Sequence, residues 1–189
     1  MINVSNWKIT KEFNLSYGHR VWSQVLNPEF SIDSKCACRH LHGHNMTVLV
    51  TLLGTELRAG MITDFKHLNW FKKWLDDFLD HKFIMDKSDP ELNHIFSCVA
   101  FNSEEEFLQN FQKQEFNLFT PNMRRFDNHR EIYEGLVIVP FIPTSELLSM
   151  WFYNIVSKKM EKILKENFAQ VDSVRIFETP KSSSQFSLL

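Results

Sequence analysis

The sequence predicts an α+β fold, and three observations support this class. Segments near both ends of the chain have the alternating or β-branched pattern of strands. Two longer segments repeat apolar residues at steps of three and four, as amphipathic helices do. The chain has 189 residues, of which 43% are hydrophobic, and this fits one globular domain. We therefore expect a single domain over residues 1–189, with an insertion at about 86–134.

The composition excludes several classes of protein. Lys and Arg total 21 against 23 Asp and Glu, so the net charge of -2 indicates no nucleic-acid partner. No apolar run reaches the about 20 residues of a membrane helix, and the N-terminus lacks the pattern of a secretion signal. We therefore expect a cytoplasmic protein without a membrane partner. Its cysteines are too few for a disulfide framework and should be thiols: Cys36, Cys38 and Cys98.

Two strands are predicted in the N-terminal part of the chain. Trp7–Tyr17 alternates in part, with apolar residues on one parity, and His19 follows its end. Asn45–Leu53 is rich in β-branched residues and stops at a glycine. His42 and His44 precede this second strand on one parity, so both side chains should leave the same face.

Two further strands are predicted in the C-terminal half. Leu136–Phe141 is an apolar run, and its interior Pro140 favours an edge position or a strand end. Val171–Glu178 places Glu178 on the same parity as two apolar residues. A carboxylate is therefore expected on a face that its neighbours mark as buried, which is unusual for Glu.

Two amphipathic helices are predicted as well. The first runs from Asp64, which is a suitable N-cap, to about Leu79. The second and longer helix opens at Pro143, with Thr144 as its N-cap, and keeps an apolar side as far as Ile163. Together with the strands, these helices complete the expected domain.

The stretch between Asp86 and Glu134 is polar and poorly periodic, and we interpret it as an insertion. It contains one predicted helix, in which Ser103 and Glu106 form a capping box. The C-terminal segment PKSSSQFSLL shows little periodicity and is expected to form a flexible tail. The basic residues of the insertion are expected to form a solvated surface turn: Arg124, Arg125, His129 and Arg130.

Three histidines form a candidate metal site. His19 ends one predicted strand, and the run His42-Gly43-His44 begins the next. Gly43 lets the backbone approach an ion closely, while the two flanking rings leave the same face. Three imidazole nitrogens with a free fourth position are typical of catalytic zinc, although other first-row ions accept the same ligands. An isolated H-x-H pair is more often coincidental, so its neighbours have to support the site.

A thiol lies close to this pair in the sequence. Cys38 is four residues before His42, and Cys36 is six residues before it. A nearby cation or histidine converts a cysteine to its thiolate more easily, which makes it a base or nucleophile. Alternatively, either cysteine is a small apolar residue, or a fourth metal ligand that would make the site structural. His40 is expected outside the metal site, because three histidines in one short run do not easily reach one ion.

A second polar pair, Asp80-His81, lies just past the first predicted helix. A carboxylate beside an imidazole fixes its tautomer and raises its basicity, as a general acid or base requires. An Asp-His pair at a helix end can instead be a capping or dipole device. Glu178 has two interpretations as well, a functional acid on a buried face or an exposed strand-end residue.

Taken together, six ordered blocks of the sequence resemble the family of 6-pyruvoyltetrahydropterin synthase and 6-carboxytetrahydropterin synthase. Each block alone is a weak signal, whereas six of them in order over most of the chain are a strong one. The matching blocks are Phe13–Arg20 (FNLSYGHR), Cys38–Asn45 (CRHLHGHN), Gly60–Leu68 (GMITDFKHL), Leu79–Phe83 (LDHKF), Pro143–Glu146 (PTSE) and Val174–Thr179 (VRIFET).

This resemblance implies the tunnelling fold, in which a four-stranded antiparallel sheet packs two helices on one face. Subunits of such proteins assemble into a barrel-like trimer, commonly stacked as a hexamer, with active sites between subunits. The 18 Phe and 5 Trp of this chain would suit such interfaces. The implied partners are therefore further copies of the chain and a small-molecule substrate, 7,8-dihydroneopterin triphosphate.

The resemblance also implies a role for each candidate residue. The zinc ligands correspond to His19, His42 and His44. The catalytic thiol and the proton-relay pair correspond to Cys38, Asp80 and His81. The residues that bind the pterin correspond to Thr144, Ser145, Glu146 and Glu178. A carboxylate such as that of Glu178 accepts two parallel hydrogen bonds from a 2-amino-pyrimidinone edge, whereas helix capping explains Thr144 equally well.

Three activities are compatible with these residues. The spacing of Cys38 and the presence of Leu41 before His42 favour the bacterial carboxy-forming branch. Such a zinc-dependent lyase converts the substrate to 6-carboxy-5,6,7,8-tetrahydropterin, acetaldehyde and triphosphate, in queuosine or 7-deazaguanine biosynthesis. With Cys36 as the active thiol, the alternative is a 6-pyruvoyltetrahydropterin synthase, which eliminates triphosphate without side-chain cleavage. The third hypothesis is a non-catalytic pterin- or zinc-binding protein.

Overall fold

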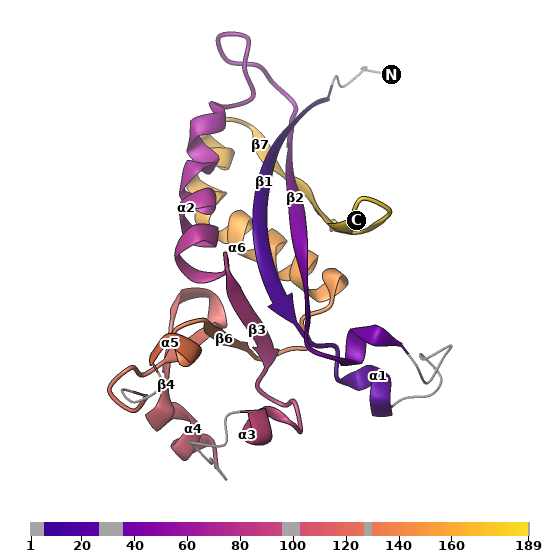
Figure 1. Ribbon diagram of the computed structural model, residues 1–189. Coiled ribbons are helices and arrows are strands. Elements are labelled where there is room, and N and C mark those ends of the chain that lie inside the picture. Colours follow the sequence, from indigo (N-terminus) through magenta and orange to yellow (C-terminus); the bar gives the residue numbers. More distant parts are fainter. Residues whose placement is uncertain (1–5, 27–35, 96–102, 127–129, 189) are drawn as a thin grey trace. The chain divides into compact units, whose positions relative to one another are not determined.

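The computed structural model describes residues 6–26, 36–95, 103–126 and 130–188, which form two compact units (Figure 1). The first unit contains residues 6–15, 45–77 and 145–188, and the second contains the described residues of 16–44 and 78–144. Strands β1 (Trp7–His19) and β2 (His42–Gly54) pass through both units. The chain is therefore a mixed α+β protein, as the sequence predicts.

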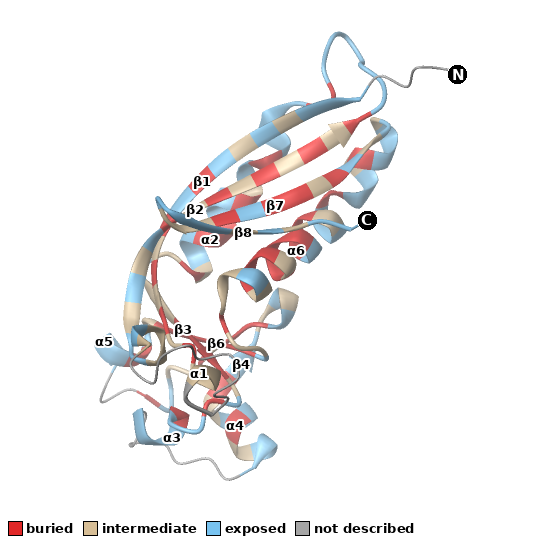
Figure 2. Ribbon diagram, turned by 90° about the vertical axis from the view of Figure 1, so that its right-hand side faces the viewer, coloured by how far each residue is buried: buried red, intermediate tan, exposed pale blue. Residues whose placement is uncertain are grey.

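The first unit is built on four strands in the order β1-β2-β7-β8. Its later strands are β7 (Ala169–Thr179) and β8 (Ser182–Phe186). β2 pairs antiparallel with β7, and β7 pairs antiparallel with β8. From Met46 to the end of β2, buried residues alternate with half-buried ones (Figure 2), because successive side chains of a strand point to opposite faces. The three predicted strands that lie in β1, β2 and β7 are confirmed, each slightly longer than its sequence pattern.

The first predicted helix opens with a tighter turn. Asp64 accepts a hydrogen bond from the Lys66 N–H at 2.8 Å, and this caps the 3-10 turn η2 (Phe65–Leu68). The α-helix α2 (Asn69–Phe78) begins only after that turn. The predicted cap is thus confirmed, but it starts a 3-10 turn, which is common at the N-terminus of an α-helix.

The second predicted helix is α6 (Ser145–Glu166), and it contacts β7 and β8. Its aromatic rings meet those of α2 edge to face. Phe71 lies 5.6 Å from Phe152, and Trp74 lies 5.4 Å from Trp151, between ring centroids. Edge-to-face pairs are each worth about 0.5–1.5 kcal/mol beyond the buried area, so they fix the packing of the two helices.

The second unit joins short elements. Its strands occur in the order β4-β5-β6-β3-β1: β3 (Lys82–Asp86), β4 (Phe111–Lys113), β5 (Phe119–Pro121) and β6 (Leu136–Val139). Its helices and 3-10 turns are α1 (Ser23–Leu26), η1 (Ala37–Arg39), α3 (Leu92–Ile95), α4 (Glu104–Asn110), η3 (Glu115–Asn117) and α5 (Arg130–Tyr133). No helix in the described part of the chain is long and apolar enough to cross a membrane.

The predicted third strand does not lie at a sheet edge. β6 pairs parallel with β3 and antiparallel with β5, so it has a neighbour on each side. All four of its residues are buried, as in parallel strands covered on both faces. Pro140 follows the end of β6 and therefore removes no N–H from the ladder. The sheet is mixed and has eight strands, so it is larger than the expected four-stranded antiparallel sheet: β3 pairs parallel with β1 and β6. The short strand β3 carries no alternating pattern that could reveal it.

The stretch from residue 86 to 134 has a core of its own. Phe107 stacks on Phe111 at 4.8 Å, and Phe126 packs on Tyr133 at 4.3 Å, between ring centroids. The buried cluster consists of Met85, Leu92, Phe107, Phe111, Phe119, Phe126, Tyr133, Leu136 and Ile138. The sequence predicts only one helix here, α4, whose Ser103 N-cap accepts from the Glu106 N–H at 3.2 Å as expected. The other elements are too short for periodicity to reveal them.

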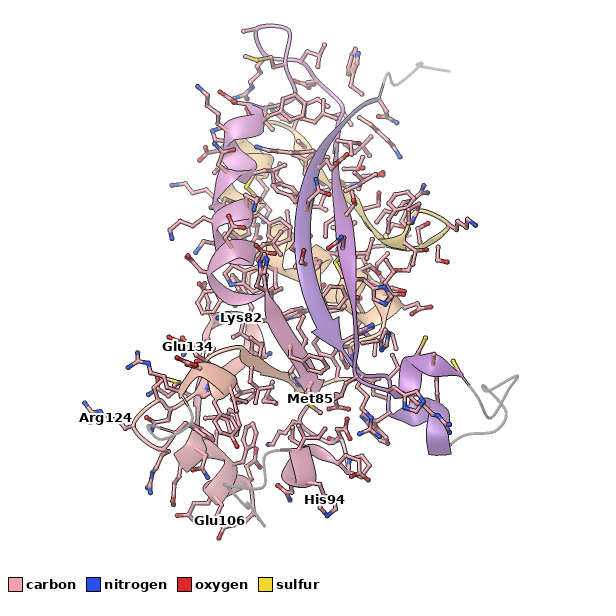
Figure 3. The ribbon with its side chains drawn as sticks, in the orientation of Figure 1. Lys82, Met85, His94, Glu106, Arg124 and Glu134 are labelled. Atoms are coloured by element: carbon pink, nitrogen blue, oxygen red, sulfur yellow. The ribbon has the colours of Figure 1, made fainter. Side chains whose placement is uncertain are left out.

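The surface of this stretch carries the basic residues. Arg124, Arg125 and Arg130 are exposed, and Arg124 points away from the ribbon (Figure 3). At the end of this stretch, the Glu134 carbonyl accepts a hydrogen bond from the Lys82 ammonium of β3 at 2.9 Å. His129 lies outside the described residues. The three described arginines therefore fit the predicted solvated turn.

The C-terminal segment is not a flexible tail. Residues 182–186 form β8, which pairs with β7 over most of its length. Phe186 also packs on Tyr153 of α6, with ring centroids 5.2 Å apart. The serine-rich sequence hides this strand, because its order comes from main-chain pairing with β7 rather than from an apolar pattern of its own.

Candidate metal centre

The three predicted histidines meet at the junction of two strands. His19 is the last residue of β1, and His42 and His44 are the first and third residues of β2. One ligand atom from each histidine lies within 4.8 Å of the other two. The ring centroids are separated by 4.4 to 5.2 Å. The sequence prediction that these imidazoles share one face is therefore confirmed.

Glycine makes this junction possible. A Cβ on Gly43 would lie 2.8 Å from the Tyr17 carbonyl oxygen, closer than real Cβ atoms approach. A Cβ on Gly18 would lie 2.4 Å from the ring of Phe83. Gly43 thus permits the close approach of β1 and β2 that brings the histidines together.

Two backbone carbonyls set the orientation of the rings. Nδ1 of His19 lies 2.6 Å from the Pro143 carbonyl oxygen, and Nδ1 of His42 lies 2.8 Å from the His40 carbonyl oxygen. A carbonyl only accepts, so each Nδ1 must carry the proton and donate it. In the neutral rings the lone pair is then on Nε2, the atom that remains for a metal. The buried Nε2 of His42 has no hydrogen-bond partner among the described residues.

The electrostatics favour the neutral form of His19. The pKa of His19 is lowered to about 4, chiefly by burial and to a lesser extent by the nearby His42 and His44, while the Pro143 carbonyl acts in the opposite direction. The side chain is 1% exposed. At neutral pH the ring is uncharged, which is the form of histidine that binds metal ions.

This donor set fits a divalent metal ion. Each of the three imidazoles offers one nitrogen as a ligand, and in His19 and His42 the proton is fixed on the other nitrogen, Nδ1. Three such ligands leave a fourth coordination position open, as in catalytic zinc sites. Hydrogen bonds from the second ring nitrogen to carbonyls are the usual support of such ligands. Imidazole also suits copper, iron and nickel, so the three histidines are compatible with several divalent metals and do not identify one.

The thiols lie on the turn before β2. Cys38 is in the 3-10 turn Ala37–Arg39, and Cys36 stands at the start of that turn. Both are half-buried and free of disulfides. The Cys38 carbonyl accepts from the Val21 N–H at 2.9 Å, which ties the turn to the segment after β1. Cys98 lies outside the described residues.

Asp80 and His81 are a true pair. Nδ1 of His81 lies 3.1 Å from one carboxylate oxygen of Asp80, and the other oxygen accepts from the Ser16 N–H at 2.7 Å. The His81 N–H donates to the Ser16 carbonyl, and its φ of 57° places it in the left-handed region. Asp80 therefore binds the backbone of β1 and does not cap a helix. The His81 side chain is 81% exposed, so it is accessible to solvent.

Glu178 belongs to the first unit and lies at an irregularity of β7. The pairs Phe177–Ser183 and Thr179–Ser182 leave Glu178 as an extra residue opposite β8, which is a β-bulge. Because the bulge interrupts the alternation, Glu178 is half-buried rather than buried as its parity predicts. Bulges often re-aim a side chain near a functional site.

The three residues before and within the first turn of α6 have local contacts. The Thr144 N–H donates to the Ile142 carbonyl at 2.7 Å. The Ser145 hydroxyl donates to the Glu146 carboxylate at 3.4 Å, and the Glu146 carbonyl accepts from the Ser149 hydroxyl at 2.8 Å. Thr144 belongs to the second unit and the others to the first.

Sequence reasoning missed one supporting side chain. Tyr17 is buried, and its ring centroid lies 4.9 Å from that of His19 and 6.0 Å from that of His44. It packs against two of the three imidazoles and limits their rotation. Its parity with His19 on β1 is a signal that could have revealed it.

The sequence has clear relatives. It matches the 6-pyruvoyl tetrahydropterin synthase family over residues 8–187. It is 28% identical to a 6-carboxy-5,6,7,8-tetrahydropterin synthase from Aquifex aeolicus, over 95% of this chain and 97% of that protein. The corresponding protein of Haemophilus influenzae is 24% identical, over 95% of this chain and 98% of its own length.

Solved structures share the fold of this chain. An uncharacterized protein from Wolinella succinogenes superposes with a TM-score of 0.85 at 38% identity, over 97% of this chain and 98% of that one. A 6-pyruvoyltetrahydropterin synthase from Plasmodium vivax superposes with a TM-score of 0.57 at 19% identity, over 96% and 97% of the two chains. At that identity the second likeness shows the fold alone.

Proposed function

Because this chain belongs to the 6-pyruvoyl tetrahydropterin synthase family, we propose that it converts 7,8-dihydroneopterin triphosphate to 6-carboxy-5,6,7,8-tetrahydropterin, acetaldehyde and triphosphate. The observation that carries the proposal is the cluster of His19, His42 and His44, with two of its rings oriented by backbone carbonyls. The names of the relatives from Aquifex aeolicus and Haemophilus influenzae support the carboxy-forming product. The protein is thus a 6-carboxytetrahydropterin synthase-like lyase.

Zinc is the proposed metal, held by Nε2 of His19 and His42 and by one ring nitrogen of His44. Bound there, zinc supplies a Lewis acid that polarises the oxygen atoms of the substrate side chain and eases loss of their protons. The protein contributes a neutral, buried ligand in His19, whose pKa of about 4 keeps it uncharged at neutral pH. The site therefore needs no change of protonation at His19 to bind the cation.

Protein groups then move the protons. Cys38 is the proposed base, because its turn leads directly into β2 and the ligands His42 and His44. His81 is the proposed partner acid or base, and the Asp80 carboxylate at 3.1 Å orients its ring. The Ser16 N–H at 2.7 Å holds Asp80 in turn, so the pair is anchored to the strand that ends at His19.

The pterin ring is the proposed ligand of the first unit. The Glu178 carboxylate would accept two parallel hydrogen bonds from the 2-amino-pyrimidinone edge, an arrangement that gives both energy and orientation. Thr144, Ser145 and Glu146 are proposed to line the pterin pocket. The product would serve 7-deazaguanine biosynthesis, such as that of queuosine, in the cytoplasm, and the chain would act as a trimer or hexamer with active sites between subunits.

The sister activity is the alternative that a specific observation favours. Cys36 and Cys38 are both half-buried at the same turn and neither is in a disulfide, so the turn offers two thiols. With Cys36 as base, the enzyme would release triphosphate and form a 6-pyruvoyl product without acetaldehyde. If Cys38 were a fourth metal ligand instead, the chain would bind zinc or pterin without turnover.

One experiment separates these activities. Zinc-loaded protein is incubated with fresh dihydroneopterin triphosphate, and pterin masses are read with acetaldehyde assayed in parallel. A carboxytetrahydropterin with acetaldehyde supports the proposal, and a pyruvoyl product without acetaldehyde moves the assignment to the sister activity. No product from metal-loaded protein would contradict both. In that case X-ray absorption showing a sulfur ligand would identify the binding protein.

Two thiol variants make the assay specific. Cys38→Ala should abolish turnover while zinc remains bound, because the metal would keep its three nitrogen ligands. Cys36→Ala is the matched control on the same turn and should keep its turnover. The reverse result would assign the base to Cys36.

A further inference from the structure

A buried ion pair lies behind the thiol-bearing turn of the second unit. The Arg20 guanidinium donates to the Asp89 carboxylate at 2.5 Å, and the two side chains are 12% and 1% exposed. Arg20 directly follows the ligand His19, and Asp89 lies just after β3. A paired, hydrogen-bonded charge is the form in which ions persist in a protein interior, so this contact is a specific feature of the fold.

The Arg20 guanidinium makes a second contact through a different nitrogen. Its Nε donates to the Arg39 carbonyl at 2.8 Å, while its terminal nitrogen holds Asp89. Arg39 is the residue after Cys38 in the turn Ala37–Arg39. A guanidinium presents its donors in a rigid fork, so one side chain sets both partners at fixed positions.

The next two residues, Val21 and Trp22, likewise bind the thiol-bearing turn and the end of β3. The Val21 N–H donates to the Cys38 carbonyl at 2.9 Å. The Trp22 indole N–H donates to the Asp86 carboxylate at 2.7 Å. Residues 20 to 22 therefore hold the thiol-bearing turn through two carbonyls and hold the loop after β3 through two carboxylates.

The Asp89 carboxylate is itself fixed by the loop. Its bonded oxygen also accepts from the Glu91 N–H at 2.9 Å, and the Asp89 N–H donates to the Asp86 carbonyl at 3.1 Å. A loop that is ordered by its own backbone bonds can hold the guanidinium without adjusting to it. The position of the turn thus depends on residues more than 45 positions away in the sequence.

We infer that Arg20, anchored by Asp89, is a positioning residue that fixes the Cys38 turn relative to the strand carrying His19. This inference rests on the proposed function only in giving Cys38 a catalytic role. Like any charge pair with Arg20, the bridge needs a carboxylate at residue 89. Unlike a plain charge pair, it also needs two donors with fixed geometry on one side chain.

The test uses alkylation of Cys38 by iodoacetamide in the zinc-loaded protein, followed by peptide mass spectrometry. Arg20→Lys keeps the positive charge but loses the fork, and Asp89→Asn removes the anchoring charge. Asp77→Asn is the matched control, because Asp77 forms an exposed ion pair with Lys73 on α2. We expect the Cys38 alkylation rate to rise roughly tenfold in both test variants, as for loss of one charged hydrogen bond, and to stay unchanged in the control.

Steady-state kinetics give the second readout. A displaced base should lower kcat by on the order of 100-fold while KM and zinc content stay close to wild type. The double variant should be no worse than the worse single variant, because the two residues act as one unit. Circular dichroism at the assay temperature confirms that each variant is folded, and Arg20→Lys decides the question if Asp89→Asn does not fold.

The outcomes separate this inference from the proposed function. Alkylation rates within about twofold of wild type in a folded variant, less than one lost hydrogen bond would produce, overturn the positioning role whatever the activity. If the alkylation rate changes in the variants but the wild-type protein shows no turnover, the positioning role stands and the proposed catalytic function is contradicted. A fall in zinc content together with kcat would show that Arg20 supports His19 instead of the turn.

Discussion

The two units build their cores from different kinds of sequence. The first unit uses long elements, in which β2 alternates buried and half-buried residues from Met46 to Gly54 and α6 runs for 22 residues. The second unit gathers aromatic side chains from helices and strands of three to seven residues in the stretch after β3. Periodicity reveals the first kind of core and misses the second, although both are equally buried. An aperiodic, polar stretch with many Phe residues can therefore still be an ordered core.

The candidate metal centre belongs to the second unit, and its loss should have the largest effect. His42→Ala removes a ligand whose Nε2 is buried, so we expect loss of stoichiometric zinc and a fall in turnover of at least on the order of 100-fold. Metal analysis and the product assay measure this. His40→Ala is the control, since His40 is exposed and keeps the backbone carbonyl that holds His42. Equal zinc in both variants would contradict the site.

Truncating a side chain in the aromatic core after β3 should destabilise the protein as much as truncating one in the core of the first unit. Phe107→Ala leaves a cavity beside Phe111 and should lower the free energy of unfolding by about 3–5 kcal/mol. Phe71→Ala in the first unit should have a similar effect. Urea denaturation measures both, with the half-exposed neighbour Leu108→Ala as control. A loss below about 1 kcal/mol for Phe107→Ala would show that this stretch contributes little to stability.

A smaller effect is expected where the strands meet. Gly43→Ala places a Cβ 2.8 Å from the Tyr17 carbonyl, so β1 and β2 must separate, at a cost of about 1–3 kcal/mol. Zinc affinity should fall with stability, because the histidines move apart. Gly135→Ala meets nothing closer than 3.7 Å and serves as the control in thermal denaturation and zinc titration. Unchanged zinc affinity in Gly43→Ala would separate the strand junction from the metal site.

The smallest expected effect concerns α4, the one helix that the sequence predicts within the aperiodic stretch. Ser103→Ala removes the N-cap of α4 and should lower the free energy of unfolding by about 1 kcal/mol. Ser183→Ala, an exposed serine on β8, should change it by less than half of that. Thermal denaturation of the two variants side by side measures the difference. Equal values would mean that α4 adds nothing beyond the packing of Phe107.

Much of the candidate site was predictable from sequence because its ligands are local. His42 and His44 share a parity on one strand, and His19 ends the neighbouring one, so strand geometry alone brings their rings to one face. Asp80 and His81 are adjacent, and their pairing needed only the local turn. The supporting groups were not predictable. The carbonyls of Pro143 and His40 are backbone atoms that every sequence offers, so no residue type marks them.

By itself, the sequence determined the α+β class, the long elements, the N-caps at Asp64 and Ser103, and the shared face of His42 and His44. Each of these depends on contacts within a few residues or on a simple repeat. Only the tertiary structure decided that β6 is internal, that the serine-rich segment is β8, and that Arg20 joins the Cys38 turn to Asp89. These features depend on partners far away in the chain, and the free energy of pairing with a distant partner leaves no local pattern in the sequence.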